Sequence, residues 1–186
     1  MAKVVITGRI PAIAVEQLRA EHDVVSWDEP VVITREELLK RVKGADAIVS
    51  LLTEKVDAEL LDAAGPQLKV VSNVAVGYNN IDVPACKERN VLVTNTPGVL
   101  TEATADIAMA LILMSTRRLA EGERVIRKQD PWQWGMFYML GSGIQGNQLG
   151  IVGMGLIGAA VARRAKAFGM TIAYTKRSPL DAATAK

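Results

Sequence analysis

Short apolar runs alternate with amphipathic segments along the first hundred residues. Aliphatic and β-branched runs, typical of buried strands, occur at 4–6, 24–27, 47–51, 68–72 and 91–94. Between these runs the apolar residues recur with the period of a helix. A strict alternation of strand and helix predicts an α/β fold with a parallel sheet covered on both faces, in a flavodoxin-like arrangement.

Three of the helical segments follow a side chain that can cap a helix. Thr34 forms a capping box with Glu37, and Asp57 and Asp82 precede the next two segments. The side-chain oxygen of such a residue accepts a hydrogen bond from a first-turn N–H group. We therefore expect helices to begin directly after Thr34, Asp57 and Asp82.

The alternation stops at the turn sequence 95–98. Residues 101–128 then carry one helical pattern of unusual length, and we expect a single helix that links two domains. Residues 129–147 are rich in glycine, tryptophan and tyrosine without a clean period, so we expect an ordered loop or arm. A second series of strand, turn, helix and strand follows. The pattern predicts one domain at 1–97 and the start of another at 98–186.

The second series contains a glycine-rich turn between an apolar strand and a helix. The turn, Gly153-Met154-Gly155-Leu156-Ile157-Gly158, fits the pattern G-x-G-x-x-G. In this setting Gly153 permits the tight turn, Gly155 lets the backbone approach a pyrophosphate, and Gly158 lets helix and strand pack closely. The helix N-terminus adds unpaired N–H groups and a partial positive charge. The pattern predicts a dinucleotide site, with a glycine turn that binds nothing as the alternative.

The strand after this helix bears on the choice of nucleotide. NAD-selective sites usually end this strand in Asp or Glu, which binds the ribose 2′-hydroxyl. This sequence has Thr175-Lys176-Arg177-Ser178 instead. Arg177 can hold a 2′-phosphate through charge-assisted hydrogen bonds, with Lys176 and Ser178 beside it. We expect NADP(H) to be preferred over NAD(H); the alternative is that Lys176 and Arg177 are solvated loop charges.

Charge and hydropathy exclude two classes of partner. The 22 basic and 20 acidic side chains nearly balance and form no basic stripe, so we expect no nucleic-acid partner. The pairs Arg117-Arg118 and Arg163-Arg164 are interpreted as solvated helix faces. The apolar run 107–114 is too short to span a bilayer, so we expect a buried helix and no membrane partner.

Cysteine and histidine are scarce. One cysteine, Cys86, excludes an internal disulfide, and with the single histidine, His22, it cannot supply a Cys/His metal site. We therefore expect no metal and a cytoplasmic location, where thiols stay reduced.

Several motifs together resemble the D-isomer-specific 2-hydroxyacid dehydrogenases, most closely their glyoxylate/hydroxypyruvate reductase branch. The motifs are LLTEKVDAELLDAAGPQLKVVSNVAVGYNNIDVPACKERNVLVTNTPGVLTEATADIAMALIL, GIVGMGLIGAAVARRAKAFGM and YTKR, and the likeness extends over nearly the whole chain. The resemblance implies a flavodoxin-like substrate domain followed by the first part of a Rossmann domain. It also implies hydride transfer between NAD(P)H and a short 2-oxo acid such as glyoxylate or hydroxypyruvate, in a homodimer formed through the cofactor domains.

The resemblance assigns residues to both reactants. The backbone amides of Val76 and Gly77 would meet the substrate carboxylate, and Leu52 would shape the substrate pocket. Thr104 would touch the nicotinamide end of the cofactor. Many relatives have Arg at the position of Leu156, so the pyrophosphate would here depend on backbone amides.

The resemblance also implies that the catalytic Arg, Glu and His come from segments that would follow residue 186. We therefore expect the N-terminal part of a longer enzyme, with no catalytic residue of its own. His22 lies between the first predicted helix and the second strand, where a surface histidine is the ordinary interpretation.

Two other interpretations stay open. The chain could be a non-catalytic nucleotide binder or a dimerisation partner, or a stand-alone flavodoxin-like domain with a vestigial tail.

Overall fold

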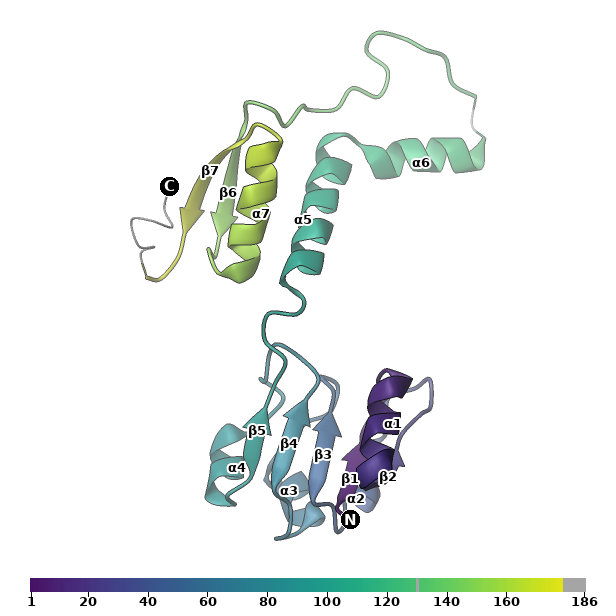
Figure 1. Cartoon of the computed structure of the whole chain (residues 1–186). Helices are drawn as coiled ribbons and strands as arrows, with labels where there is room; N and C mark the ends of the chain where they lie inside the picture. The colour runs from purple at the N-terminus through teal and green to yellow at the C-terminus, as the bar shows by residue number, and fades with distance from the viewer. Residues whose placement is uncertain (130, 179–186) are drawn as a thin grey trace. The chain divides into compact units, whose positions relative to one another are not determined.

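The computed structural model describes residues 1–129 and 131–178, so Asp130 of the expected arm and residues 179–186 of the expected second domain lie outside the described residues. The chain divides into two compact units, Met1–Pro97 and Gly98–Lys186 (Figure 1). Each unit is described by itself below.

The first unit contains a five-stranded parallel sheet, which confirms the predicted α/β class. The strand order is β2-β1-β3-β4-β5, and every pair of neighbours is parallel. The strands are β1 (Lys3–Ile6), β2 (Asp23–Ser26), β3 (Ala47–Ser50), β4 (Val70–Asn73) and β5 (Leu92–Thr94). Because the strands are parallel, all their carboxyl ends lie at one edge of the sheet.

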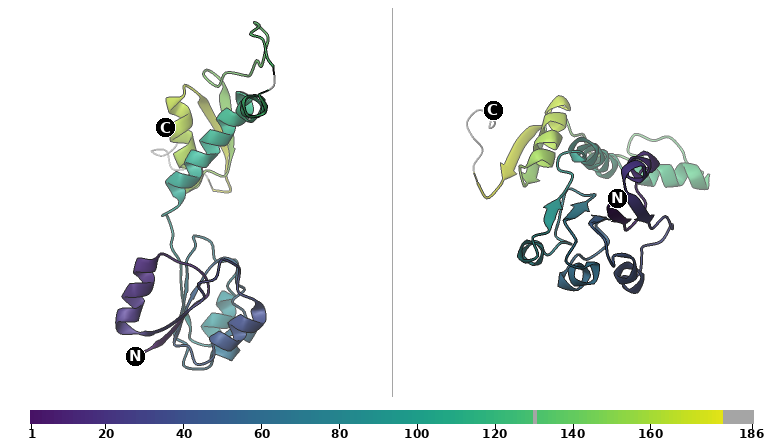
Figure 2. Two further views of the ribbon diagram at one scale, coloured as in Figure 1. Left: turned by 90° about the vertical axis from the view of Figure 1, so that its right-hand side faces the viewer. Right: turned by 60° about the horizontal axis from the view of Figure 1, so that its bottom comes forward.

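Four helices cover the two faces of this sheet. The helices are α1 (Ala12–Glu21), α2 (Arg35–Arg41), α3 (Ala58–Ala64) and α4 (Val83–Glu88). Helix α1 lies on one face and has no buried residue, whereas α2, α3 and α4 lie on the other (Figure 2). The main core therefore forms on the α2–α4 side, where Leu38, Leu60 and Cys86 pack against Ile48 and Val71.

The expected capping residues begin their helices. The Thr34 hydroxyl accepts from Glu37 N–H at 3.3 Å, and the carboxylates of Asp57 and Asp82 accept from Leu60 N–H and Ala85 N–H at 3.2 and 3.0 Å. The reciprocal half of the capping box is absent, because the Glu37 carboxylate pairs with Arg41 one turn later, at 2.7 Å.

The described part of the second unit contains a two-stranded parallel sheet and three helices. The elements are α5 (Thr101–Thr116), α6 (Leu119–Lys128), β6 (Gln148–Val152), α7 (Leu156–Ala167) and β7 (Thr171–Thr175). Helices α5 and α7 pack together through Ala105, Met109, Ala160 and Ala165. This core positions the turn between β6 and α7.

The expected single helix at 101–128 is wrong, because the chain breaks between α5 and α6. Arg118 has φ of 55°, a left-handed conformation that ends a helix. The Thr116 carbonyl accepts from Ser142 N–H at 2.8 Å, so the returning segment satisfies a carbonyl that helix α5 leaves unpaired. The unit boundary also falls before α5, between Pro97 and Gly98, so α5 belongs wholly to the second unit.

Arg163 and Arg164 are not simply solvated. Arg163 pairs with Glu102 at 2.9 Å, and Arg164 contacts Glu102 and Asp106 at 2.8 and 2.7 Å. The two arginines therefore link α7 to the first turns of α5.

Candidate functional site

The glycine turn between β6 and α7 has a separate structural reason for each glycine. Gly153 has φ of 99°, which other residues rarely adopt. A Cβ at Gly158 would lie 2.3 Å from the Gly153 carbonyl oxygen, so α7 approaches the turn too closely for any side chain there. A Cβ at Gly155 would meet no atom within 4 Å, so this glycine leaves the surface in front of its backbone open.

The turn faces the end of β7 across a pocket. Gly153 N–H donates to the Thr175 carbonyl at 2.8 Å, which joins the two segments where their strands end. The pocket has a volume of about 630 Å³. Its lining residues are Val152, Gly153, Met154, Gly155, Thr175, Lys176, Arg177 and Ser178. The structure therefore gathers six of the expected nucleotide residues around one cavity.

The pocket is electrostatically suited to an anion. Lys176 and Arg177 are exposed, and neither forms an ion pair with any residue that the structure describes. The first turn of α7 contains no acidic residue, and its N-cap, Gly155, has no side chain to satisfy the helix. These features leave positive charge at the pocket and unpaired N–H groups at the helix N-terminus that follows Gly155.

Four expected cofactor residues do not line this pocket. Leu156, Ile157 and Gly158 form the first turn of α7, and the first hydrogen bond there runs from Ala159 N–H to the Gly155 carbonyl. Their own N–H groups thus precede the helical ladder and have no acceptor within the described residues. Thr104 lies on α5, where it is exposed.

The expected substrate residues lie at the carboxyl edge of the first unit. Leu52 follows β3, and Val76 and Gly77 follow β4, the neighbouring strand in the sheet. The Val74 N–H group donates to the Ser50 carbonyl at 2.8 Å, which ties the two loops together where they leave the sheet. Leu52 and Val76 are 60% and 42% exposed, so the apolar surface of this edge is open.

The loop that carries Val76 and Gly77 is fixed by its carbonyl groups. Ala75 O accepts from Thr96 N–H at 2.8 Å, Val76 O from Asn95 Nδ2 at 2.8 Å, and Gly77 O from Asn73 Nδ2 at 2.9 Å. The N–H groups of Val76 and Gly77 have no acceptor among the described residues. They are thus available to an anionic ligand.

The loop at Gly77 is not a nest, the concave arrangement of consecutive backbone N–H groups that binds an anion. An αR-αL nest needs a residue with positive φ, and no residue in 74–78 has one. A Cβ at Gly77 would meet nothing within 4 Å. Because Gly77 has no side chain, the space beside its backbone N–H group stays open.

Sequence analysis missed a buried polar network beneath the two loops. The buried Glu54 carboxylate accepts from Thr7 Oγ1, Thr53 Oγ1 and Leu51 N–H. Asn80 Nδ2 donates to the carbonyls of Leu51 and Glu54, each at 3.0 Å, and its amide also bonds that of buried Asn73. The sequence shows its members only as two short polar pairs, Thr53-Glu54 after β3 and Asn79-Asn80 after β4.

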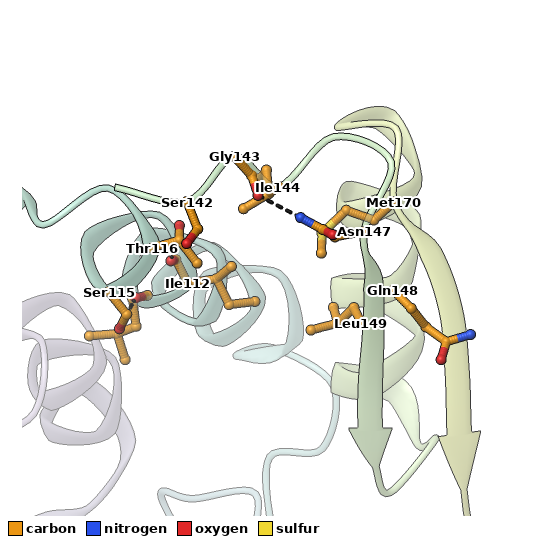
Figure 3. Close-up of a pocket in the computed structure, with 11 residues that line it drawn as sticks. Ile112, Ser115, Thr116, Ser142, Gly143, Ile144, Asn147, Gln148, Leu149 and Met170 are labelled. Atoms are coloured by element: carbon orange, nitrogen blue, oxygen red, sulfur yellow. Dashed lines mark hydrogen bonds between the residues drawn. The ribbon is translucent and has the colours of Figure 1, made fainter. Parts of the chain in front are cut away.

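A second pocket lies at the opposite end of β6. It has a volume of about 480 Å³ and lies between the end of α5 and the start of β6, beside Ile112, Ile144 and Leu149 (Figure 3). Asn147 Nδ2 donates to the Gly143 carbonyl at its rim, at 2.6 Å. Ligands of parallel α/β sheets bind at the carboxyl ends of strands, so this amino-end pocket is a poor nucleotide site.

The single histidine and the single cysteine are poorly placed for catalysis. His22 is half-buried directly before β2, at the amino edge of the sheet, and therefore away from Leu52 and Val76 at the carboxyl edge. Burial, together with nearby Asp82, raises the pKa of the Cys86 thiol, which disfavours the reactive thiolate.

The described residues also lack two kinds of site. Within 1–129 and 131–178 there is no group of three His, Cys, Asp or Glu that could hold a metal ion. None of the described helices is both long and apolar enough to cross a membrane.

Comparison with known proteins gives consistent matches over almost all of the chain. Residues 4–185 match the family model of the D-isomer specific 2-hydroxyacid dehydrogenase catalytic domain. The glyoxylate reductase of Thermococcus onnurineus is 46% identical over 181 residues, which are 95% of this chain and 54% of that protein. The glyoxylate reductase of Korarchaeum cryptofilum is 47% identical over 174 residues, which are 92% and 52% of the two chains. The chain spans about half the length of the curated relatives it matches.

Solved structures agree in fold over a similar range. A protein of Polaromonas sp., assigned to the D-isomer specific 2-hydroxyacid dehydrogenases and named as NAD-binding, superposes with a TM-score of 0.91 at 36% identity, covering 99% of this chain and 58% of that one. A glyoxylate reductase from Paecilomyes thermophila superposes with a TM-score of 0.83 at 32% identity, and the match covers 98% of this chain and 58% of that one.

Proposed function

The chain belongs to the D-isomer specific 2-hydroxyacid dehydrogenase family, and from this premise we propose that it binds NADP(H) and a short 2-oxo acid for hydride transfer between them. Residues 1–97 form the substrate domain in this proposal, and residues 98–186 form the start of the cofactor domain. Glyoxylate and hydroxypyruvate are the proposed substrates, the first of them because matched relatives are named glyoxylate reductases.

One observation carries the cofactor assignment. The pocket at the carboxyl ends of β6 and β7 combines the glycine turn with Lys176 and Arg177. The free N–H groups of the α7 first turn suit a pyrophosphate, and the guanidinium of Arg177 suits a 2′-phosphate. None of the described residues that line the pocket is a carboxylate that would repel that phosphate.

When bound, the nicotinamide nucleotide supplies or accepts the hydride, and the residues of this chain bind and orient the two reactants. The backbone amides of Gly155, Leu156 and Ile157 would hold the pyrophosphate, and Thr175 to Ser178 would hold the ribose phosphate. Leu156 contributes no charge, so binding there depends on the backbone. Thr104 is proposed to contact the nicotinamide end.

The carboxyl edge of the first unit is proposed to bind the substrate. The N–H groups of Val76 and Gly77 donate to the carboxylate of the substrate. Leu52 limits the size of the group at the other end of the substrate. Proton transfer to the carbonyl needs a general acid, which His22 at the other edge of the sheet cannot provide. Binding of both reactants is thus the part of the reaction that we assign to these residues.

A second candidate function is self-association. Helix α6 has no buried residue. In the segment after it, the side chains of Trp134 and Phe137 are 83% and 81% exposed. Exposed apolar surface of this kind is typical of a protein interface, and we propose a homodimer formed through the cofactor domain. With its single, buried thiol, the protein is proposed to act in the cytoplasm.

Amide chemical shifts test the two binding sites separately. NADPH added to ¹⁵N-labelled protein should shift the signals of Gly153, Gly155 and Arg177, and glyoxylate should shift those of Val76 and Gly77. Signals of Gly143 and Asn147, beside the second pocket, serve as the control and should stay unchanged. Shifts confined to the second pocket would contradict the proposal.

A further inference from the structure

We propose that Asn95 is a positioning residue for the substrate, because its side-chain amide orients the Gly77 N–H group. This inference rests on the proposed function, which assigns the N–H groups of Val76 and Gly77 to a substrate carboxylate. It concerns a residue that touches neither reactant in that assignment and acts only through the backbone of the loop.

The geometry of the peptide plane carries the argument. Asn95 Nδ2 donates to the Val76 carbonyl at 2.8 Å. In a trans peptide the carbonyl of one residue and the N–H of the next lie in one rigid plane and point in opposite directions. No cis peptide bond occurs among the described residues. By holding the Val76 carbonyl, Asn95 therefore directs the Gly77 N–H away from itself.

The neighbouring peptide plane is held by the neighbouring residue. Thr96 N–H donates to the Ala75 carbonyl at 2.8 Å, which by the same reasoning directs the Val76 N–H. Two consecutive residues after β5 thus set the direction of two consecutive amides after β4. The Thr96 contact is made by the backbone and survives a side-chain substitution, whereas the Asn95 contact does not.

Little else restrains the Gly77 amide. Val76 and Gly77 are exposed, and a Cβ at Gly77 would meet no atom, so packing does not hold this peptide. Asn73 holds the next carbonyl, that of Gly77, and so fixes the following plane instead. The direction of the Gly77 N–H therefore depends mainly on the Asn95 amide.

Substitution of Asn95 should separate positioning from stability. In the full chain, Asn95→Ala should weaken glyoxylate binding about tenfold, the effect of one well-placed hydrogen bond to a charged group. The amide order parameter of Gly77 should fall in the absence of ligand. Thr94→Val is the matched control, since it removes the Ser72–Thr94 hydroxyl contact of 2.7 Å on the same strand end without touching the loop. The melting temperatures of the two variants should be similar.

The outcomes distinguish this inference from the function on which it rests. If wild-type protein binds glyoxylate at Gly77 and Asn95→Ala binds it within twofold of Thr94→Val, the positioning role is wrong while the substrate site stands. If wild-type protein shows no shift at Val76 or Gly77, the substrate site is wrong and the inference falls with it. Should Asn95→Ala not fold, Asn95→Asp keeps the size of the side chain without its donor, and an unchanged Gly77 order parameter in that variant would overturn the proposal.

Discussion

Gly158 determines how closely helix α7 can approach the glycine turn that follows β6. A methyl group there would lie 2.3 Å from a backbone carbonyl oxygen, which cannot move aside as a flexible side chain can. Gly155, three residues earlier, has open space in front of it. The same small substitution should therefore affect stability at Gly158 and ligand binding at Gly155.

We expect Gly158→Ala to destabilise the protein by about 1–3 kcal/mol, the usual cost of overpacking. Gly155→Ala should leave the free energy of unfolding nearly unchanged but weaken NADPH binding, because its methyl group would stand where the pyrophosphate approaches. Urea denaturation and a nucleotide titration of both variants measure the two effects. Equal stability of Gly158→Ala and wild type would contradict the close packing.

Sequence reasoning succeeded at residues whose role depends on local backbone. The caps Thr34, Asp57 and Asp82 act within four residues, and the strand-turn-helix setting of Gly153 is visible in the order of residues alone. Asn95 could not be found in this way, because its contact with Val76 depends on the pairing of β4 with β5 in the sheet.

At the scale of elements, Asp57 joins helix α3 to helix α2. Its carboxylate caps α3 and also accepts a charge-assisted bond from Arg35 of α2. Partial burial opposes ionisation of Asp57, but the hydrogen bonds from Arg35 and Leu60 outweigh it and lower the pKa of this carboxyl below its ordinary value of 3.8. A lowered pKa in the folded state stabilises the protein wherever the carboxyl is ionised.

The stabilisation from Asp57 should be complete above the ordinary carboxyl pKa and be lost as the pH falls through the lowered pKa of the folded state. Asp57→Ala should cost about 1–2 kcal/mol near neutral pH, mainly through the lost cap. Asp57→Asn keeps the cap and should cost less, because the partly exposed ion pair adds little. Denaturation of wild type and both variants at pH 7 and pH 3 checks this. The loss of unfolding free energy relative to wild type should be smaller at pH 3, and a loss that grows toward acid would contradict the account.

The break between α5 and α6 shows where element prediction fails. Hydrophobic periodicity continues through 101–128, and nothing in the sequence marks Arg118 as a residue with positive φ. Where helix α5 ends, a distant segment, at Ser142, bonds the Thr116 carbonyl. A contact between residues so far apart in the chain is invisible to a local pattern.

At the scale of the whole molecule, the two units differ in how fully their sheets are covered. The first has five strands with helices on both faces, whereas the described part of the second has two strands, with Val152 of β6 91% exposed. Both units form a core, but the described part of the second leaves one side of its sheet less covered.

The exposed arm after α6 gives a prediction about assembly. Wild-type protein should form a dimer in light scattering, and the double variant Trp134→Ser and Phe137→Ser should shift it toward the monomer, because the arm supplies the apolar contact. Val31→Ser with Val32→Ser is the matched control, since these valines of the first unit are 63% and 59% exposed. A wild-type monomer, or equal dissociation in both variants, would contradict the proposed interface.

The central claim is that the pocket at the ends of β6 and β7 holds a phosphorylated nicotinamide nucleotide, and calorimetric titration with NADPH and NADH tests it most directly. We expect wild-type protein to bind NADPH about ten- to a hundredfold more tightly than NADH, which corresponds to about 1.5–3 kcal/mol for one charge-assisted contact. Arg177→Ala should remove most of that preference while leaving NADH affinity nearly unchanged. Binding of neither nucleotide, or a preference for NADPH that persists without Arg177, would contradict the account.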